Sequence, residues 1–545
     1  MKVQYKEELY EIQEKIKISE LLKKEIENSK EQVIGAKFNN EYVNLDYEIT
    51  EDGTIDLITT SEKQGMKIYI RTLIYIMGKA FEELYPKAKV RANYQLSNSM
   101  YCEIDNMKVT DEMITSIENK MKEIIKKDLP IQEKILSREE AQRFYDETDS
   151  SKGRLQFDNE NNNKIHMQYC EDYCNYIYGG VATRTGVVKL FDLLKYSDGF
   201  LLRYPSSKNP NVLEKYKETK KLLWALDEYD DIHKILNVET VFKLNRYVKE
   251  NKIKDIIMLD EALHEKKIAG IADKIAKNKK IKMVLIAGPS SSGKTTFAQR
   301  LGIQLKLNGL KPVTISVDNY FVERAQTPKD EKGEYDFESL EAIDLELFNK
   351  HLIKLLNGEE IEMPEFDFYE GTKRYNGKMM KLAEDEILVI EGIHCLNDRL
   401  TEKIAKEQKY KIYISALTVL NLDRFNRIST TDTRLVRRIV RDYQFRGYSA
   451  KDTIKTWYKV NRGEEKNIFP FQEEANSIFN TSLIYELGAL KSIAMPLLDE
   501  IKNDEPEYAE AKRIKSMLEY FETIDPELVP KNSLVKEFLG GGNFE

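Results

Sequence analysis

The chain changes its pattern of apolar and polar positions near residue 280. Before that point, apolar residues alternate with polar ones or recur at helical spacing among many charges. After it come short, nearly continuous apolar runs separated by helical stretches, namely KMVLIAG (282–288), PVTISV (312–317), EILVIEG (386–392) and KYKIYISA (409–416). Such runs are typical of parallel strands buried on both faces. The pattern predicts a doubly wound α/β domain over residues 281–500, followed by a C-terminal helix and tail over 501–545.

The first sixty residues predict a small α/β module. EYVNLDYEIT (41–50) and TIDLIT (54–59) alternate apolar and polar positions on either side of Asp52 and Gly53. An Asp-Gly pair between alternating runs is typical of two strands joined by a tight turn.

Residues 61–215 predict an α+β domain that begins with a helix. The stretch 69–85 has helical spacing and stops at Pro86, which cannot continue a helix. The polar stretch 146–164 is expected to be an exposed loop. Residues 216–280 are mostly charged and helical in period, which predicts a helical linker whose last helix is HEKKIAGIADKIAKN (264–278).

Composition narrows the class of protein. The 545 residues are 41% apolar and 33% charged, with a formal net charge of −8, which argues against a nonspecific nucleic-acid coat protein. The four cysteines are too few for a disulfide framework in a chain of this length. The N-terminal residues contain no apolar signal core, and no stretch is apolar enough to span a membrane. We expect a cytoplasmic protein.

A phosphate-binding loop is the strongest chemical signal. The first predicted parallel strand runs into Gly288, four further residues, then Gly293, Lys294 and Thr295. The glycines let successive backbone N–H groups point at phosphate oxygens, and the following helix presents its positive end. The alternative is a glycine-rich turn that binds no phosphate and is followed by an unrelated lysine. The residues expected to contact the phosphates are Gly288, Pro289, Ser290, Ser291, Ser292, Gly293, Lys294, Thr295 and Thr296.

Two carboxylates follow two other predicted strands. Asp318 comes after PVTISV and Glu391 ends EILVI, so both should lie at the edge of the sheet where ligands bind. A carboxylate there can hold Mg²⁺ or accept the proton of an attacking hydroxyl. The alternative is that each acid only caps the next helix. The chain has no Asn-Lys-x-Asp motif for reading guanine, which leaves ATP as the expected phosphate donor.

Four arginines fall on one predicted helical face of DTRLVRRIVRDYQFR (432–446). Arg434, Arg437, Arg438 and Arg441 are spaced as apolar residues usually are. Guanidinium groups suit phosphate because they stay charged and offer paired donors. We expect a lid that closes over ATP. The alternatives are a solvated face balanced by nearby acids and a nucleic-acid stripe.

Residues 281–500 resemble the uridine kinase and phosphoribulokinase family, through GPSSSGKTT, SVDNYF, YDFESLEAID, MPEFDF, VIEGIH and TDTRLVRRIVRDYQFRG. The resemblance implies that Asp318 is the general base and that Mg²⁺ is held by Thr295, Asp318 and Glu391. It implies a substrate pocket with Asp336 on the ribose hydroxyls, together with Phe366 and Tyr320. It assigns Lys294, Arg434 and Arg438 to catalysis and Arg437 and Arg441 to ATP.

The chain departs from that family at two pyrimidine-reading positions. Uridine kinases usually have tyrosine where Phe366 stands and histidine where Gly371 stands. Phosphorylation of a nucleoside 5′-hydroxyl, with uridine first, is the expected activity. A phosphoribulokinase-like kinase of another small alcohol is the alternative.

The N-terminal half resembles other modules. Residues 1–60 resemble a TGS domain of the β-grasp type, and 61–215 resemble the editing-type second domain of threonyl-tRNA synthetases. Arg71, Tyr75 and Tyr178 stand where three of that family's four ligands would be, and Cys174 alone matches.

Two expectations follow for the N-terminal half. An ATP-controlled regulator that binds RNA or tRNA is a second alternative for the chain as a whole. His166, Cys170 and Cys174 recur every fourth residue, so on a helix they would share one face. That face would be either a soft-metal site or a half-buried face of inert residues.

Overall fold

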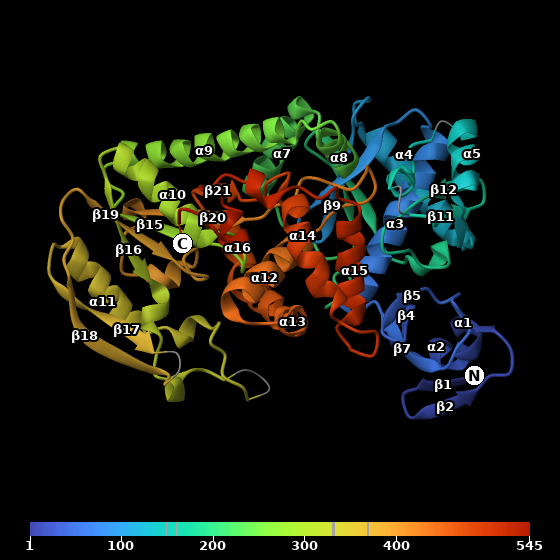
Figure 1. Cartoon of the computed structure of the whole chain (residues 1–545), viewed down its shortest axis with the longest axis horizontal. Coiled ribbons are helices and arrows are strands. Elements are labelled where there is room, and N and C mark those ends of the chain that lie inside the picture. Colours follow the sequence, from blue (N-terminus) through green and yellow to red (C-terminus); the bar gives the residue numbers. More distant parts are fainter. Residues whose placement is uncertain (149, 160–161, 330–332, 368–369, 545) are drawn as a thin grey trace.

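The computed structural model describes residues 1–148, 150–159, 162–329, 333–367 and 370–544. The molecule is elongated, with the N-terminal sheet near one end and the phosphate-loop sheet near the other (Figure 1). The long helix α9 (Ile253–Lys277) runs along one side of the molecule, from the phosphate-loop sheet to α7 and α8. No helix among the described residues is long and apolar enough to cross a membrane.

The N-terminal module is a mixed sheet with strand order β2-β1-β7-β4-β5. Its strands are β1 (Lys2–Tyr5), β2 (Glu8–Glu11), β4 (Val33–Phe38), β5 (Glu41–Val43) and β7 (Gly53–Thr59), and short helices α1 (Ile18–Leu21) and α2 (Lys23–Glu27) accompany them. The predicted hairpin across Asp52 and Gly53 is wrong. β6 (Glu48–Ile49) pairs instead with β3 (Ile16–Lys17), and β7 lies between β1 and β4.

The second region is built around the helix that the sequence predicts. α3 (Lys63–Leu84) ends before Pro86 and packs on α4 (Asp111–Lys127). A four-stranded antiparallel sheet has the order β13-β14-β9-β8, with strands Asp192–Tyr196, Gly199–Arg203, Ser99–Ile104 and Val90–Gln95. The expected exposed loop, residues 146–164, contains the C-terminal end of α5 (Arg138–Thr148) and the short helix α6 (Arg154–Asp158), of which Leu155 and Gln156 are buried. Its residues 149 and 160–161 lie outside the described residues.

The helical face expected for His166, Cys170 and Cys174 does not exist. These residues lie on β11 (Ile165–Cys170) and β12 (Tyr173–Asn175), which form a three-stranded sheet with β10 (Gln132–Leu136). Cys174 is opposite Tyr169 in the register, so it points to the other face of the sheet from His166 and Cys170. His166 Nδ1 lies 2.9 Å from Glu133 Oε1.

The expected linker is packed into the kinase region. α7 (Lys220–Leu236), α8 (Val241–Lys249) and α9 are helices, as predicted. Ile268 and Ile275 of α9 share an apolar core with Val284 and Phe297 of the phosphate-loop region. α9 therefore supports the sheet, whereas Leu226 of α7 shares an apolar cluster with Tyr94 and Leu201 of the second region.

The phosphate-loop sheet confirms the predicted parallel architecture. Its strand order is β16-β19-β15-β20-β21, and all of its pairings are parallel. The strands are β15 (Met283–Ala287), β16 (Lys311–Ser316), β19 (Glu386–Glu391), β20 (Lys409–Ser415) and β21 (Ser477–Asn480), and the sequence analysis missed only the last. Alternate residues of β15 enter two separate cores, Val284 and Ile286 in one and Met283 and Leu285 in the other.

Helices cover this sheet, and α14 and α15 lie between it and the second region (Figure 1). They are α10 (Lys294–Leu307), α11 (Leu345–Leu356), α12 (Thr430–Arg446), α13 (Ala450–Asn467), α14 (Glu486–Asp499), α15 (Tyr508–Glu519) and α16 (Lys536–Leu539). A separate hairpin is formed by β17 (Ile361–Asp367) and β18 (Thr372–Met380). The C-terminal end of the chain lies beside β15 and α10 in Figure 1.

Candidate active site

The phosphate loop joins β15 to α10, and its glycines are required by its geometry. Gly293 has φ +83°, and a Cβ there would overlap the side chain of Leu534. A Cβ on Gly288 would overlap the backbone oxygen of Ile414 on the next strand. Side chains at either position would displace the loop. The loop conformation thus depends on neighbours from two distant segments of the chain.

Lys294 and two backbone amides of the loop and the following helix bond to protein groups. Lys294 Nζ donates to the carbonyl oxygens of Gly288 at 2.9 Å and Pro289 at 3.1 Å. Ser290 N–H donates to Glu464 Oε1 at 2.8 Å, and Thr296 N–H donates to Glu537 Oε2 at 3.1 Å. Carboxylates therefore accept from amides of the loop and the first turn of α10, where the helix end favours negative charge.

A cavity of about 820 Å³ opens beside the loop. It is large enough for a nucleotide-sized ligand. The predicted site residues that line it are Ser290, Ser291, Ser292, Gly293, Lys294, Thr295, Thr296, Asp318, Glu391, Arg438 and Arg441. The remaining predicted residues, Gly288, Pro289, Tyr320, Asp336, Phe366, Arg434 and Arg437, do not line this cavity.

Asp318 and Glu391 come together at the edge of the sheet, as predicted. Ser316 is opposite Glu391 in the β16–β19 register, and Asp318 follows two residues later. Burial raises the pKa of each carboxyl group, and Lys294 opposes the rise in both. Glu391 Oε2 is buried and has no hydrogen-bond partner among the described residues. An additional positive charge would therefore be favoured between these acids.

The donor set fits Mg²⁺. The Asp318 and Glu391 carboxylates and the Thr295 hydroxyl line one cavity, and Mg²⁺ prefers oxygen ligands from one or two carboxylates together with substrate phosphates. No group of three or more His, Cys, Asp or Glu side chains suited to a metal occurs in the described part of the chain. A metal held here would thus depend on the phosphate donor for several of its ligands.

The arginine stripe lies under the phosphate loop and is not a lid in this structure. Arg434 and Arg437 are 1% and 0% exposed. Arg434 forms an ion pair with Glu464 and donates to the carbonyl oxygen of Ser290 at 2.9 Å. Arg437 pairs with Glu486 at 2.6 Å. These buried acids neutralise the guanidinium groups. The two arginines hold the loop by donating to the backbone oxygens of Ser290 and Ser291.

The other two arginines of the stripe reach the cavity. Arg438 donates to Ser290 Oγ at 2.8 Å, and both Arg438 and Arg441 pair with Asp442. Burial lowers the pKa of Arg438, while Asp442 opposes this. Asp432, an acid at the start of the same helix that could have balanced the stripe, instead pairs with Arg513 of α15.

The expected substrate residues are dispersed. Tyr320 is fully buried, because the short 3₁₀ helix of residues 317–320 turns its side chain into the core. Its ring packs against Phe348, and its hydroxyl lies 3.1 Å from His351 Nδ1. Asp336 pairs with Lys466 at 3.1 Å. Phe366 lies on β17 with its ring 5.6 Å from that of Phe321.

The sequence analysis missed Glu338, which lines the cavity. Burial, with Glu464 and Asp336 nearby, raises the pKa of Glu338 to about 7. Its carboxylate lies against the backbone of Gly463, where any side chain would overlap it. A signal in the sequence was its place within YDFESLEAID, two residues after Asp336.

The C-terminal segment also contributes to the cavity. Lys531, Lys536 and Glu537 line it, and Leu534 packs on Gly293. Gln444 of α12 donates to the carbonyl oxygen of Phe538 at 3.0 Å. The sequence assigned these residues no role, because what they do depends on a tertiary contact with the loop.

Comparisons with known proteins concern first the region that contains the phosphate loop. Residues 283–483 match the model of the "Phosphoribulokinase / Uridine kinase family". The uridine kinase of Mycoplasma genitalium is 31% identical over 178 residues, which are 33% of this chain and 74% of that protein. A solved structure described as a possible uridine kinase from Bacillus stearothermophilus is 18% identical and covers 39% of this chain and 99% of its own, with a TM-score of 0.23.

The N-terminal region has a different relative. The threonine–tRNA ligase of Caldanaerobacter subterraneus subsp. tengcongensis is 28% identical over 192 residues, which are 35% of this chain. The match spans only 30% of that ligase. The chain therefore joins a region similar to kinases to a region similar to part of a synthetase.

Proposed function

This chain belongs to the phosphoribulokinase / uridine kinase family, and from that premise we propose that it transfers the γ-phosphoryl group of ATP to the 5′-hydroxyl of a nucleoside, uridine first. One observation carries the proposal. The phosphate loop and two strand-end carboxylates, Asp318 and Glu391, open into one cavity. A phosphate donor and an acceptor alcohol can meet in such a cavity.

Asp318 is the proposed general base. Its carboxyl group faces the cavity, and burial raises its pKa, which makes it a better proton acceptor for the attacking hydroxyl. Lys294, released from the carbonyl oxygens of the loop, would neutralise charge on the β- and γ-phosphates. Positioning and charge compensation supply most of the acceleration in such transfers.

Thr295, Asp318 and Glu391 would hold Mg²⁺. When bound, this ion neutralises phosphate charge and orients the donor. Arg438 and Arg441 reach the same cavity and can contact phosphate, whereas Arg434 and Arg437 maintain the loop's shape. This assigns the four arginines two separate roles.

We further propose the domain division 1–60, 61–215, 216–280, 281–500 and 501–545, with the third and fifth segments supporting the kinase. The alternative acceptor is another small alcohol. It is favoured by Phe366, which lies against Phe321 and lacks a hydroxyl, and by Gly371, which has no side chain to read a base.

The test is turnover by the full chain with MgATP and a panel of nucleosides and sugar phosphates, scored by ADP release and by the mass of the product. Asp318→Asn should bind ATP nearly as tightly as the natural protein and lose about 10²- to 10⁴-fold in turnover. Asp385→Asn is the matched control and should keep normal turnover. Asp385 is exposed just before the first residue of β19, at the end of this strand away from Glu391, and pairs with Lys311. Normal turnover by Asp318→Asn would overturn the assignment of the base.

A further inference from the structure

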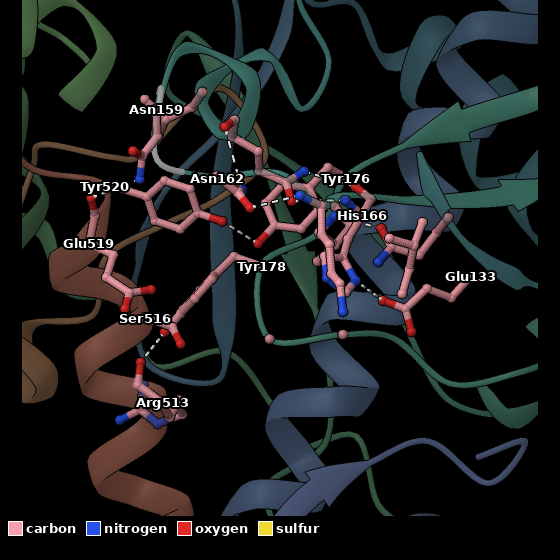
Figure 2. A pocket seen from close by; sticks show the side chains of 18 of the residues that line it. Glu133, Asn159, Asn162, His166, Tyr176, Tyr178, Arg513, Ser516, Glu519 and Tyr520 are labelled. Atoms are coloured by element: carbon pink, nitrogen blue, oxygen red, sulfur yellow. Dashed lines mark hydrogen bonds and ion pairs between the residues drawn. The ribbon is translucent and has the colours of Figure 1, made fainter. Parts of the chain in front are cut away.

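The phosphate-loop cavity differs from a larger one elsewhere in the molecule. A cavity of about 1670 Å³ lies between the N-terminal module, the second region and α15, and Figure 2 shows part of its wall. Polar side chains of that wall bond to one another, His166 to Glu133 at 2.9 Å and Tyr176 to Tyr520 at 2.6 Å. The phosphate-loop cavity, in contrast, is faced by side chains that have no such partner within the described residues.

One wall of the phosphate-loop cavity is the C-terminal segment, which comprises residues 531–544. The side chains or backbone that it contributes to the cavity are those of Lys531, Ser533, Lys536, Glu537, Gly542 and Phe544. The segment lies outside residues 283–483, the region that matches the kinase family. What this wall binds therefore does not follow from the family match.

The C-terminal segment is held in place along its length. Leu534 and Phe538 belong to an apolar core that they share with β15. Further on, the N–H of Asn543 donates to the carbonyl oxygen of Lys531 at 2.9 Å, which closes the segment into a loop. Phe544 follows directly and lines the cavity, so the same bond positions its ring.

Helix α12 forms a second wall of the cavity. Arg438, Arg441 and Phe445 recur at helical spacing, and all three line the cavity. Arg438 donates to Ser290 Oγ of the phosphate loop at 2.8 Å. Phe445 lies about two turns, or roughly 10 Å, further along the helix. This length is comparable with the span from the terminal phosphates of an extended nucleotide to its base.

The phenylalanines on the two walls take no part in an apolar core. Phe445 is 52% exposed and Phe544 is half-buried. Neither belongs to an apolar cluster among the described residues. Lys531 is exposed, and its side chain has no hydrogen-bond or ion-pair partner in the described ranges of the chain. Two open rings and one unpaired cation are suited to a flat base and the phosphates that it carries.

The first turn of α10 leads from the phosphate loop to the C-terminal segment. The reacting end of a phosphate donor is expected at Lys294, beside the carboxylates of Asp318 and Glu391. The N–H of Thr296 lies in the first turn of α10, where a helix favours phosphate, and it now donates to Glu537 Oε2 at 3.1 Å. Because Glu537 belongs to the C-terminal segment, the part of the donor beyond a phosphate bound there must pass beside this segment.

We propose that the C-terminal segment forms the base-binding wall of the phosphate-donor site, where Phe445 and Phe544 contact the base and Lys531 contacts the phosphates. The inference rests on the proposed phosphoryl transfer, because it needs a nucleotide in the phosphate loop. Aromatic rings bind every base, since each base has a π-face. The two rings therefore favour nucleotides over phosphate chains that lack a base.

The test is isothermal titration calorimetry of the full chain with Mg²⁺ and without an acceptor. The two probes are ATP and inorganic tripolyphosphate, which offers a chain of three phosphates without a sugar or a base. The variants are Phe544→Ala, Phe445→Ala and Lys531→Gln. Tyr443→Ala is the matched control, because Tyr443 lies on the same helix as Phe445, is 51% exposed and does not line the cavity.

We expect Phe544→Ala and Phe445→Ala to bind ATP about 5- to 100-fold more weakly, the range for the loss of one stacked ring. Both should bind tripolyphosphate as the natural protein does, which also shows that they are folded. Lys531→Gln should bind both probes about two- to fivefold more weakly, because it loses an exposed charge that both probes contact. Tyr443→Ala should bind both probes normally.

The outcomes separate this inference from the proposed function. Equal ATP binding by the natural protein and Phe544→Ala would overturn the base-binding wall and leave the phosphoryl transfer in place. An equal loss for ATP and tripolyphosphate would also overturn it, because the ring would then support only the loop. If the natural protein bound no ATP, the proposed function itself would be wrong, and the inference would fail with it.

Discussion

The Glu464 carboxylate connects the phosphate loop to the arginine helix, and replacing it with alanine should destabilise the kinase region. Oε1 accepts from Ser290 N–H and also pairs with Arg434, while Glu464 itself is 3% exposed. Alanine would remove both interactions at once. Arg434 would keep its bond to the carbonyl oxygen of Ser290 and its contact with the Trp457 ring, but no counter-charge.

The magnitude follows from the burial of Arg434. Removing one partner of a buried ion pair costs about 3–5 kcal/mol, because the other charge stays uncompensated. The lost backbone hydrogen bond contributes about 1 kcal/mol within that range. Glu464→Gln keeps the acceptor and loses only the charge, so we expect a smaller loss. Removing both charges in Arg434→Met/Glu464→Leu should recover much of the stability, because no charge is left unpaired.

Urea unfolding followed by tryptophan emission measures this loss. Trp457 is 6% exposed and its ring lies 5.4 Å from the Arg434 guanidinium, whereas Trp224 is 66% exposed and changes environment little. Emission therefore reports the kinase region. The matched control is Glu465→Ala, whose side chain is more exposed and pairs with lysines, so that we expect less than about 1 kcal/mol. A loss of less than about 1 kcal/mol for Glu464→Ala would refute the reasoning.

Three further outcomes are expected. Glu338→Gln should be more stable than the natural protein above pH 7, by at most about 3 kcal/mol, and equal to it near pH 4. Burial raises the pKa of Glu338, so the folded state favours the protonated carboxyl group. This stabilises the fold below pH 4.5, the pKa of the group in the unfolded chain, and the stabilisation is lost as the pH rises through about 7, its pKa in the folded protein. Urea titrations at several pH values measure this change. Gly293→Ala should cost about 1–2 kcal/mol and raise the KM for ATP, because φ is +83° and Leu534 fills the space of a Cβ; unchanged KM and Tm would contradict this. Glu537→Gln should lower the KM for ATP about two- to fivefold, because the negative charge of Glu537 now competes with phosphate for the Thr296 N–H and the variant lacks that charge. A higher KM would show that Glu537 assists binding.

The sequence predicted what depends on local pattern. The parallel strands were recognisable because burial on both faces removes polar residues from them, as in Met283–Ala287. The phosphate loop was recognisable because its glycine spacing is a backbone requirement, and Asp318 and Glu391 because strand ends share one edge of the sheet. The helix from Lys63 to Leu84 followed from its period and from Pro86.

What the sequence did not predict depends on distant partners. The arginine stripe resembled a lid, because the buried Glu464 and Glu486 that neutralise it lie on other helices. Tyr320 stood beside Asp318 in the sequence, but a 3₁₀ turn sends its side chain into the core. The hairpin expected around Gly53 failed because strand pairing in the N-terminal module joins segments that are far apart.

The contact between Leu534 and the phosphate loop has a consequence for how the protein is made. The strand, loop and helix of residues 283–307 leave the ribosome long before Leu534, Val535 and Phe538, which belong to the same apolar core. During that interval the underside of the loop lacks its covering and is exposed to water or to chaperones. Nascent chains that stop before residue 534 should therefore carry the complete phosphate-loop motif and still fail to hold a nucleotide.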